Sequence, residues 1–238
     1  MLSGRSRCCG SGKVGATTPF RRRAFGDGAA EAETIFVETD VGDMEILIAS
    51  GNAGKRREFA ELFVLEGTKT MTVTVVAPDG SAPEVVETGR TYLANARLKA
   101  VAYATQYNIP ALGDDSGLAV DALGGAPGLY TARFGGPGLT AAERVDLLLA
   151  RLRGTPPERR GAHFVCALYL AYPDGRGVAA RGLVSGRIAE RPVGARGFGY
   201  DPVFLLPRLG RTMAELGPDE KHRVSHRARA VRGLLRRL

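Results

Sequence analysis

Short apolar runs alternate with longer stretches of helically spaced apolar side chains along most of this 238-residue chain. Such an alternation of strand-like and helix-like segments predicts an α/β fold. The apolar runs bounded by turn residues are expected to form strands, at residues 45–49, 70–77, 163–171 and 178–188. The last two runs flank a Pro-Asp-Gly turn, so they should pair as a hairpin.

Helical spacing of apolar side chains predicts helices between these strands and at the end of the chain. One amphipathic stretch follows residue 55 and carries Phe59, Leu62 and Phe63 on its apolar face. A second helix is expected to end at about residue 107, a third to span 140–152, and a fourth to span 219–238. Thr140 suits the N-cap of the third helix, because its hydroxyl can accept a hydrogen bond from a free backbone N–H.

The composition is that of an ordinary globular protein, with 44% hydrophobic and 24% charged residues. No apolar run approaches the roughly 20 residues of a membrane-spanning helix, so no membrane partner is expected. The cysteines do not suggest a disulfide framework, since Cys8 and Cys9 lie in a glycine-rich leader and Cys166 lies in an apolar run. We expect Cys166 to be a buried small hydrophobe in a reducing compartment, and the predicted location is cytoplasmic.

Residues 1–43 differ from the rest of the chain. They are rich in Gly, Arg, Ser and Ala, show no sustained helical or strand period, and carry as many basic as acidic side chains. We expect a disordered leader or a mis-assigned start, with Met44 as the working start and one domain over residues 44–238. Because the first 26 residues contain no acid and include three consecutive arginines, an organellar targeting peptide is the alternative.

The formal net charge of +8 is unevenly distributed along the chain. From Lys221 to the end there are seven Lys or Arg residues and no Asp or Glu. A basic segment of this kind can bind nucleic acid or polyphosphate. The alternative is that most of these charges form the solvated face of a terminal helix.

Asp114 and Asp115 are adjacent carboxylates between the apolar run 109–112 and a glycine-rich loop. In a strand-to-loop turn, neighbouring side chains diverge, so one carboxylate could hold a cation while the other orients a residue or a water. Mg²⁺ takes such oxygen ligands and usually bridges to substrate phosphates. Glu87, just before the second predicted helix, could also reach a metal. For an isolated pair, a solvated Asp-Asp turn is the alternative.

A polar, glycine-bearing turn joins the first predicted strand to the helix that follows it. A turn of this kind is a natural anion site, because free N–H groups and the helix dipole converge at the helix N-terminus. The spacing is not that of a Walker A loop, and an ordinary strand-to-helix turn is the alternative. The turn comprises Ser50, Gly51, Asn52, Ala53, Gly54 and Lys55.

Phe198 and Tyr200 flank a glycine and are followed by an acid and a proline. A rigid loop of this kind can lay a ring on a flat ligand, and base stacking on aromatic side chains contributes about 1–3 kcal/mol per base. Further along the chain, Lys221, His226 and Arg227 lie within seven residues of one another. Together they could grip a phosphate or a base carbonyl.

Five segments now stand in order along the chain. They are SGNAGK at 50–55, ETGRTYLANARLKA at 87–100, GDDSGLAVDALGGAPGLYTARF at 113–134, GFGYDPVF at 197–204 and TMAELGPDEKHRVSHRARA at 212–230. Together they closely resemble the inosine triphosphate pyrophosphatase family, the noncanonical purine nucleoside triphosphate (XTP/dITP) pyrophosphatases. The resemblance runs from about Met44 to the C-terminus, and the joint occurrence of all five segments makes it specific.

The resemblance implies Mg²⁺-dependent hydrolysis of ITP, dITP and XTP to the nucleoside monophosphate and pyrophosphate. It implies an elongated mixed α/β sheet in two lobes, with flanking helices and the substrate cleft between the lobes, usually in a homodimer. The alternatives are a pyrophosphatase of related fold acting on other modified nucleotides, and a noncatalytic nucleic-acid-binding module. The module is disfavoured because acids in the cleft would repel a phosphate backbone.

The resemblance also implies roles for individual residues, matched motif by motif. Residues 50–55 resemble the triphosphate loop, and Lys99 resembles a second phosphate contact. Glu87 and Asp115 resemble metal-site residues, with Asp115 also the general base and Asp114 supporting it. The nucleotide and base contacts are expected to be Ser116, Phe198, Gly199, Tyr200, Asp201, Lys221, His226 and Arg227.

Overall fold

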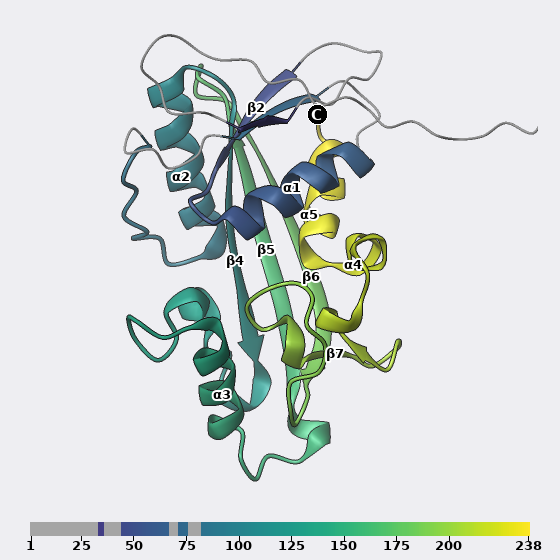
Figure 1. The fold of residues 1–238 in the computed structure, drawn as a ribbon. Coiled ribbons are helices and arrows are strands. Elements are labelled where there is room, and N and C mark those ends of the chain that lie inside the picture. Colours follow the sequence, from purple (N-terminus) through teal and green to yellow (C-terminus); the bar gives the residue numbers. More distant parts are fainter. Residues whose placement is uncertain (1–32, 36–43, 67–70, 76–81) are drawn as a thin grey trace, which may run out of the picture.

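The computed structural model describes residues 33–35, 44–66, 71–75 and 82–238, which form one eight-stranded sheet flanked by helices (Figure 1). The strand order is β1-β3-β2-β4-β5-β6-β7-β8. β2 runs parallel to β3 and β4, and the other neighbouring pairs are antiparallel, so the sheet is mixed as expected. The strands are β1 (Glu33–Ile35), β2 (Met44–Ala49), β3 (Met71–Val75), β4 (Ala111–Val120), β5 (Gly161–Ala171), β6 (Gly177–Ile188), β7 (Phe204–Leu206) and β8 (Arg211–Thr212).

The strands expected from the apolar runs are present as β2, β3, β5 and β6, and β5 and β6 form the expected antiparallel hairpin. β1 is a strand that the sequence pattern does not predict. It lies within the segment 1–43 and pairs with β3. The other residues of that segment lie outside the described residues, so the leader and the working start at Met44 stay predictions.

Helices cover both faces of the sheet, and the molecule has an upper and a lower lobe (Figure 1). In the upper lobe of Figure 1, α1 and α5 pack on one face and α2 on the other. The long strands β4, β5 and β6 continue into the lower lobe, where α3 packs beside them. The elongated two-lobed fold is therefore confirmed. The helices are α1 (Ala53–Glu66), α2 (Tyr92–Tyr107), α3 (Ala141–Arg151), α4 (Pro218–Val224) and α5 (His226–Leu235).

The side chains of β2 show why the sheet has two buried faces. Ile46 and Ile48 pack with α1 and α5, whereas Leu47 and Ala49 pack with α2. Successive side chains of a strand point to opposite faces, so an uninterrupted apolar run serves both layers. Cys166 on β5 is fully buried in the first of these cores, as predicted. None of the helices in the described part of the chain is long and apolar enough to span a membrane.

The third predicted helix is confirmed as α3, and Thr140 is its N-cap. The Thr140 hydroxyl accepts a hydrogen bond from the backbone N–H of Glu143 at 3.2 Å, and the Glu143 carboxylate accepts one from the backbone N–H of Thr140 at 2.6 Å. This reciprocal pair satisfies two of the otherwise free N–H groups at the start of the helix. It fixes the end of α3 that faces the upper lobe (Figure 1).

The prediction of one continuous helix over 219–238 is wrong. The chain breaks at Ser225, whose extended backbone (φ −65°, ψ 156°) separates α4 from α5. The Ser225 hydroxyl accepts a hydrogen bond from the backbone N–H of Ala228 at 3.1 Å, so serine acts here as an N-cap. The break puts His226 and Arg227 on the first turn of a new helix.

Gly182 on β6 allows that turn to lie directly against the sheet. A β-carbon at this position would overlap the backbone carbonyl oxygen of His226. Gly113 on β4 plays the same part on the other face, where a β-carbon would overlap the carbonyl oxygen of Ala96 on α2. These close approaches set the positions of the helices that carry candidate site residues.

Candidate active site

A cavity of about 440 Å³ lies between the lobes, and most of the predicted site residues meet there. It is lined by side chains from the turn before α1, from β4, from α3, from the aromatic loop around Phe198 and from the start of α5. The predicted residues that line it are Asn52, Gly54, Lys55, Glu87, Asp115, Ser116, Phe198, Gly199, Tyr200, Asp201, His226 and Arg227. Three more predicted residues do not line the cavity but form ion pairs with residues that do: Asp114 with Lys55, Lys99 with Glu87, and Lys221 with Asp201. The remaining residues of the turn, Ser50, Gly51 and Ala53, do not line the cavity.

Asp114 and Asp115 do not lie in a strand-to-loop turn, so that prediction is wrong. Both lie within β4, where Asp114 pairs with Leu168 and Asp115 with Ala167 of β5. The side chains point to opposite faces of the sheet because they are consecutive strand residues. Only 1% of Asp114 and 7% of Asp115 is exposed, so each carboxylate needs partners from a helix.

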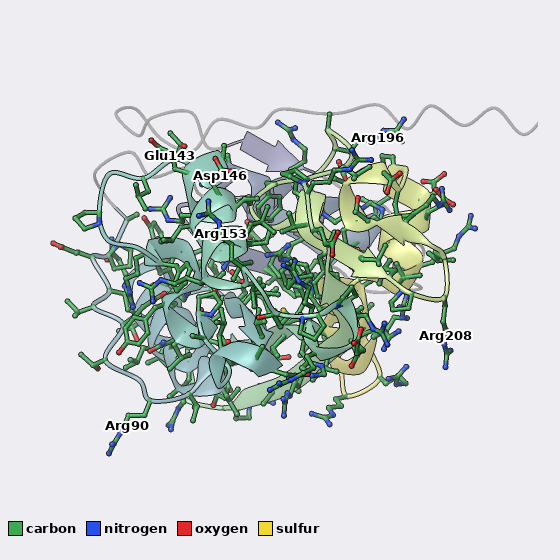
Figure 2. All side chains as sticks on the ribbon, turned by 90° about the horizontal axis from the view of Figure 1, so that it is seen from below. Arg90, Glu143, Asp146, Arg153, Arg196 and Arg208 are labelled. Atoms are coloured by element: carbon green, nitrogen blue, oxygen red, sulfur yellow. The ribbon has the colours of Figure 1, made fainter. Side chains whose placement is uncertain are left out.

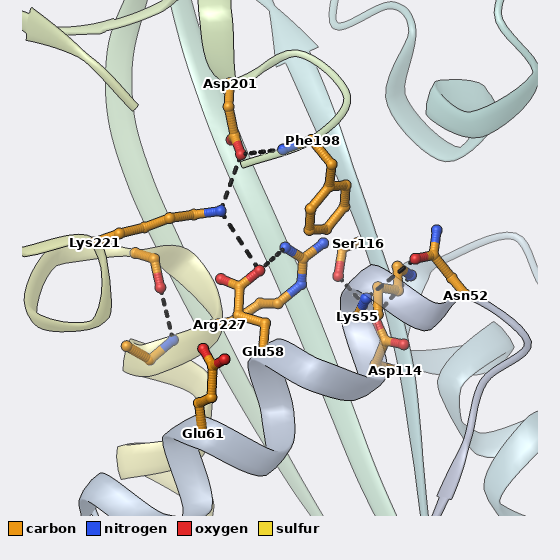
Figure 3. Close-up of polar contacts among 12 residues, drawn as sticks. Asn52, Lys55, Glu58, Glu61, Asp114, Ser116, Phe198, Asp201, Lys221 and Arg227 are labelled. Carbon is orange, nitrogen blue, oxygen red and sulfur yellow. Dashed lines mark hydrogen bonds and ion pairs between the residues drawn. The ribbon is translucent and has the colours of Figure 1, made fainter. Parts of the chain in front are cut away.

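Asp114 is held by a lysine from the first turn of α1. The Lys55 ammonium lies 2.8 Å from Asp114 Oδ2, and the Ser116 hydroxyl donates to the same oxygen at 2.9 Å (Figure 3). Burial alone would raise the pKa of Asp114, but the charges of Lys55 and Lys99 outweigh it and lower the pKa to about 2. Asp114 is therefore a permanent anion that positions Lys55.

Asp115 has a different environment on the opposite face. The Asn95 side-chain amide, on α2, donates to Asp115 Oδ2 at 3.0 Å, and Asn95 Oδ1 accepts from the backbone N–H of Gly89 at 2.8 Å. Burial raises the pKa of Asp115, and the hydrogen bond from Asn95 only partly offsets it. The nearby charge of Glu87 raises the pKa further. Asp115 is thus the more basic carboxylate of the pair, which suits proton abstraction from a water.

Glu87 brings a second carboxylate to the same cavity. It pairs with the Lys99 ammonium at 2.8 Å and lies 3.8 Å from the Arg133 guanidinium. Among the described residues, no cluster of three or more acidic, His or Cys side chains could hold a metal ion alone. Two cavity-facing carboxylates fit Mg²⁺, which usually takes one or two protein carboxylates and fills its other positions with phosphate and water oxygens.

The turn before α1 has the geometry of an anion site. Asn52 Oδ1 accepts a hydrogen bond from the backbone N–H of Lys55 at 3.1 Å, and the carbonyl oxygen of Asn52 accepts from the N–H of Arg56 at 3.0 Å. Asn52 therefore caps α1, while Gly54 and Lys55 face the cavity. The N-terminus of α1 and the positive charge of Lys55 therefore attract an anion to the same place.

The aromatic loop lines the cavity beside the first turn of α1, where a β-carbon on Gly54 would lie 3.3 Å from Phe198 Cδ1. The Lys221 ammonium lies 5.2 Å and the Arg227 guanidinium carbon 4.8 Å from the centre of the Phe198 ring. Asp201 Oδ2 accepts from the backbone N–H of Phe198 and from Lys221, each at 2.9 Å (Figure 3). Tyr200 donates its hydroxyl to the carbonyl oxygen of Thr131 at 3.2 Å. The loop is thus tied to both lobes and presents an aromatic face flanked by cations.

Glu58 on α1 is a site residue that the sequence analysis missed. Its carboxylate lies 2.9 Å from Arg227 Nη1 and 3.5 Å from the Lys221 ammonium (Figure 3). Burial would raise the pKa of Glu58, but the charges of Arg227 and Lys221 prevail and lower it. The signal in the sequence is its spacing, since Glu58 lies four residues before Leu62 on the apolar stripe of the helix.

His226 stacks on Phe164 of β5, with ring centres 4.8 Å apart and an angle of 16° between the planes. Burial and the charges of Arg227 and Lys221 hold the pKa of His226 well below its usual value, so the ring is neutral at pH 7. In the described part of the chain, no hydrogen-bond partner reaches the buried His226 Nδ1 or the buried Arg227 Nε. Both residues line the cavity. Phe164 has no sequence signal beyond an apolar strand position.

The sequence profile of the Ham1 family matches residues 46–237. The chain is 49% identical to the dITP/XTP pyrophosphatase of Geobacillus kaustophilus, over 79% of this chain and 90% of that protein. It is 48% identical to a dITP/XTP pyrophosphatase of Thermus thermophilus, over 81% of this chain and 90% of that protein.

Solved structures agree with these sequence matches. The HAM1 protein from Coxiella burnetii matches with a TM-score of 0.70 and 37% identity, covering 82% of this chain and all of that one. The Staphylococcus aureus Ham1 protein matches with a TM-score of 0.68 and 40% identity, covering 79% and 94%. The resemblance carried by the five segments is confirmed by the shared sequence, fold and length: this chain belongs to the Ham1 family.

Proposed function

We propose that this protein hydrolyses noncanonical purine nucleoside triphosphates, namely ITP, dITP and XTP, to the monophosphate and pyrophosphate. One observation carries the proposal. A single cavity brings together the Asp115 and Glu87 carboxylates, the N-terminus of α1 with Lys55, and the Phe198–Arg227 platform. The named activity of the relatives from Geobacillus and Thermus supports the same reaction.

In this proposal the triphosphate binds at the N-terminus of α1. Lys55 and Lys99 neutralise phosphate charge, and Asp114 holds Lys55 in place through the 2.8 Å ion pair. Mg²⁺, held by Glu87 and Asp115, would polarise the phosphate oxygens and favour ionisation of a water. Asp115 orients that water and accepts its proton.

The base would lie against Phe198, where His226 and Arg227 supply hydrogen-bonding groups. Inosine carries an oxo group at the position where adenosine carries an amino group. The buried Arg227 Nε–H, which has no partner among the described residues, can donate to an oxo group but would face another donor in adenine. A site that leaves buried polar groups unpaired rejects the analogue strongly.

We also propose that the protein is a cytoplasmic homodimer, as the resemblance implies. Leu93, Leu98 and Val101 are exposed on α2, with 42%, 38% and 44% of their surface accessible, and such apolar side chains suit a contact between two copies. Light scattering should report twice the mass of one chain. A monomer at micromolar concentration would contradict the dimer.

The experiment that tests the function measures pyrophosphate release from ITP, XTP, dITP, ATP and GTP, with and without Mg²⁺. Metal-dependent release from the first three, with ATP and GTP poor, is the expected result. Equal rates on ATP and GTP, or release of single phosphates, would contradict the base selection. A modified pyrimidine triphosphate in the same assay tests the alternative of a related pyrophosphatase with another substrate.

The nucleic-acid-binding alternative is weakened because two of the seven basic C-terminal residues are buried. Lys221 and Arg227 are buried in ion pairs with Asp201 and Glu58, so they are not available to a phosphate backbone. Other basic side chains point in different directions from the molecule, as the labelled arginines at its edges show (Figure 2). Salt-sensitive binding to DNA or RNA without nucleotide turnover would revive this alternative.

A further inference from the structure

Arg144 lines the candidate cavity from the lower lobe and lies outside the five family segments. It belongs to the first turn of α3, and Ala141 at the start of the same helix also lines the cavity. In Figure 1 this end of α3 faces the upper lobe, which carries α1 and the candidate phosphate turn. Arg144 therefore reaches the cavity from α3, whereas Lys55 reaches it from α1.

Arg144 differs from the other cations of the cavity because it forms no ion pair with a described carboxylate. Within the described residues, each of the other basic side chains that line the cavity has a carboxylate partner, and none of the described carboxylates lies within 4.0 Å of the Arg144 guanidinium. The partnered cations are Lys55 with Asp114 at 2.8 Å, Arg133 with Glu87 at 3.8 Å, and Arg227 with Glu58 at 2.9 Å.

The contacts of Arg144 hold the guanidinium in place and leave donors free. Its Nη1 donates to the carbonyl oxygen of Leu139, and its buried Nε has no hydrogen-bond partner in the described part of the chain. The adjacent acid, Glu143, is engaged by the backbone N–H of Thr140 at 2.6 Å. Arg144 also acts electrostatically on Tyr200, so the guanidinium lies near the aromatic loop.

We propose that Arg144 binds the polyphosphate of the substrate from the lower lobe, an inference that rests on the proposed function. A guanidinium that is partly removed from water and forms no ion pair with a carboxylate is unfavourable, so an anion is the expected ligand. In ITP the negative charge resides on the triphosphate, whereas the ribose and the purine ring are neutral. The planar guanidinium also matches pairs of phosphate oxygens. The triphosphate is then held between Lys55 on one lobe and Arg144 on the other.

The test compares R144Q with R144K and with R151Q, a matched control in which an exposed arginine of the same helix is changed outside the cavity. The measured quantities are KM and kcat for ITP and for dITP, and the inhibition constant of inorganic pyrophosphate. R144Q should raise KM for both nucleotides and the inhibition constant by about tenfold or more, as expected for a lost charge-assisted hydrogen bond. R144K, which keeps the charge but not the fork, should show a smaller rise in all three, and R151Q should show none.

A rise in KM for ITP but not for dITP would overturn the proposal, because it would mean that Arg144 contacts the ribose 2′-hydroxyl. Unchanged constants in R144Q would overturn it as well. If R144Q does not fold, R144K decides by the same comparison of the two nucleotides. A rise in KM that is equal for ITP and dITP supports the phosphate contact, and no rise in either KM overturns it. If the wild type hydrolyses neither nucleotide, calorimetry of pyrophosphate binding separates the two proposals. Weaker binding by R144Q would then uphold the phosphate contact while the proposed function fails.

Discussion

Asp114→Asn should lower the free energy of unfolding by about 2 kcal/mol at pH 7, because it removes a buried charge that Lys55 stabilises. The magnitude follows from the pKa of Asp114, which falls from an ordinary 3.8 to about 2 in the folded protein. Each pKa unit corresponds to about 1.4 kcal/mol. Only 1% of Asp114 is exposed, so screening by solvent reduces the effect little. The variant also frees Lys55, so pyrophosphate release should slow.

The pH dependence separates this charge effect from a general loss of packing. Because the pKa of Asp114 is lower in the folded than in the unfolded protein, its stabilisation is present above pH 3.8 and is lost as the pH falls towards 2. The difference between wild type and variant should therefore be complete at pH 7 and fall to roughly half at pH 3. Urea unfolding followed by circular dichroism at several pH values measures it.

Asp174→Asn is the matched control. Asp174 pairs with Arg176 at 2.7 Å, but both side chains are exposed in the turn between β5 and β6. Exposed pairs contribute little to stability, so the control should unfold like the wild type. A difference for Asp114→Asn that does not change between pH 7 and pH 3, or no difference at pH 7, would refute the reasoning.

Asp115→Asn should reduce pyrophosphate release by roughly a hundredfold or more while nucleotide affinity, measured by calorimetry, is retained. Unchanged turnover in the variant would contradict the base assignment. Glu58→Gln should cost about 3–5 kcal/mol in urea unfolding, since it leaves Arg227 buried without its nearest acid. Gly182→Ala should lower the melting temperature and raise KM by displacing the first turn of α5, whereas Gly233→Ala, with room for a β-carbon in the same helix, should do neither.

Local patterns in the sequence predicted most of the elements. The apolar runs gave β2, β5 and β6 because these strands are buried and bounded by turns, and Thr140 marked the start of α3 because its cap is local. The break at Ser225 is also a local cap, but serine within a helical pattern is ambiguous until the tertiary contacts of α5 select the break. The close packing at Gly182 shows one of those contacts.

The partners of the site residues could not be predicted, because they come from distant parts of the chain. Asp114 is 59 residues from Lys55, and Arg227 is 169 residues from Glu58. Aspartate also has a low strand propensity, which favoured a turn for the acidic pair. Tertiary structure overrides that preference by supplying a buried ion pair. The motifs identified the family, whereas the ion pairs are visible only in the fold.

The position of Asp114 and Asp115 within a strand explains how one dipeptide can serve two chemical roles. A turn would expose both carboxylates to the same solvent, and their pKa values would stay close to that of an ordinary aspartate. In β4 the alternation of side chains sends Asp114 to the face with Lys55 and Asp115 to the face with Asn95. The cation lowers one pKa, whereas burial against a neutral amide raises the other. Two neighbouring carboxylates whose environments give them different pKa values can take different roles in catalysis. Asp114 can hold a phosphate-binding lysine in place, while Asp115 accepts a proton.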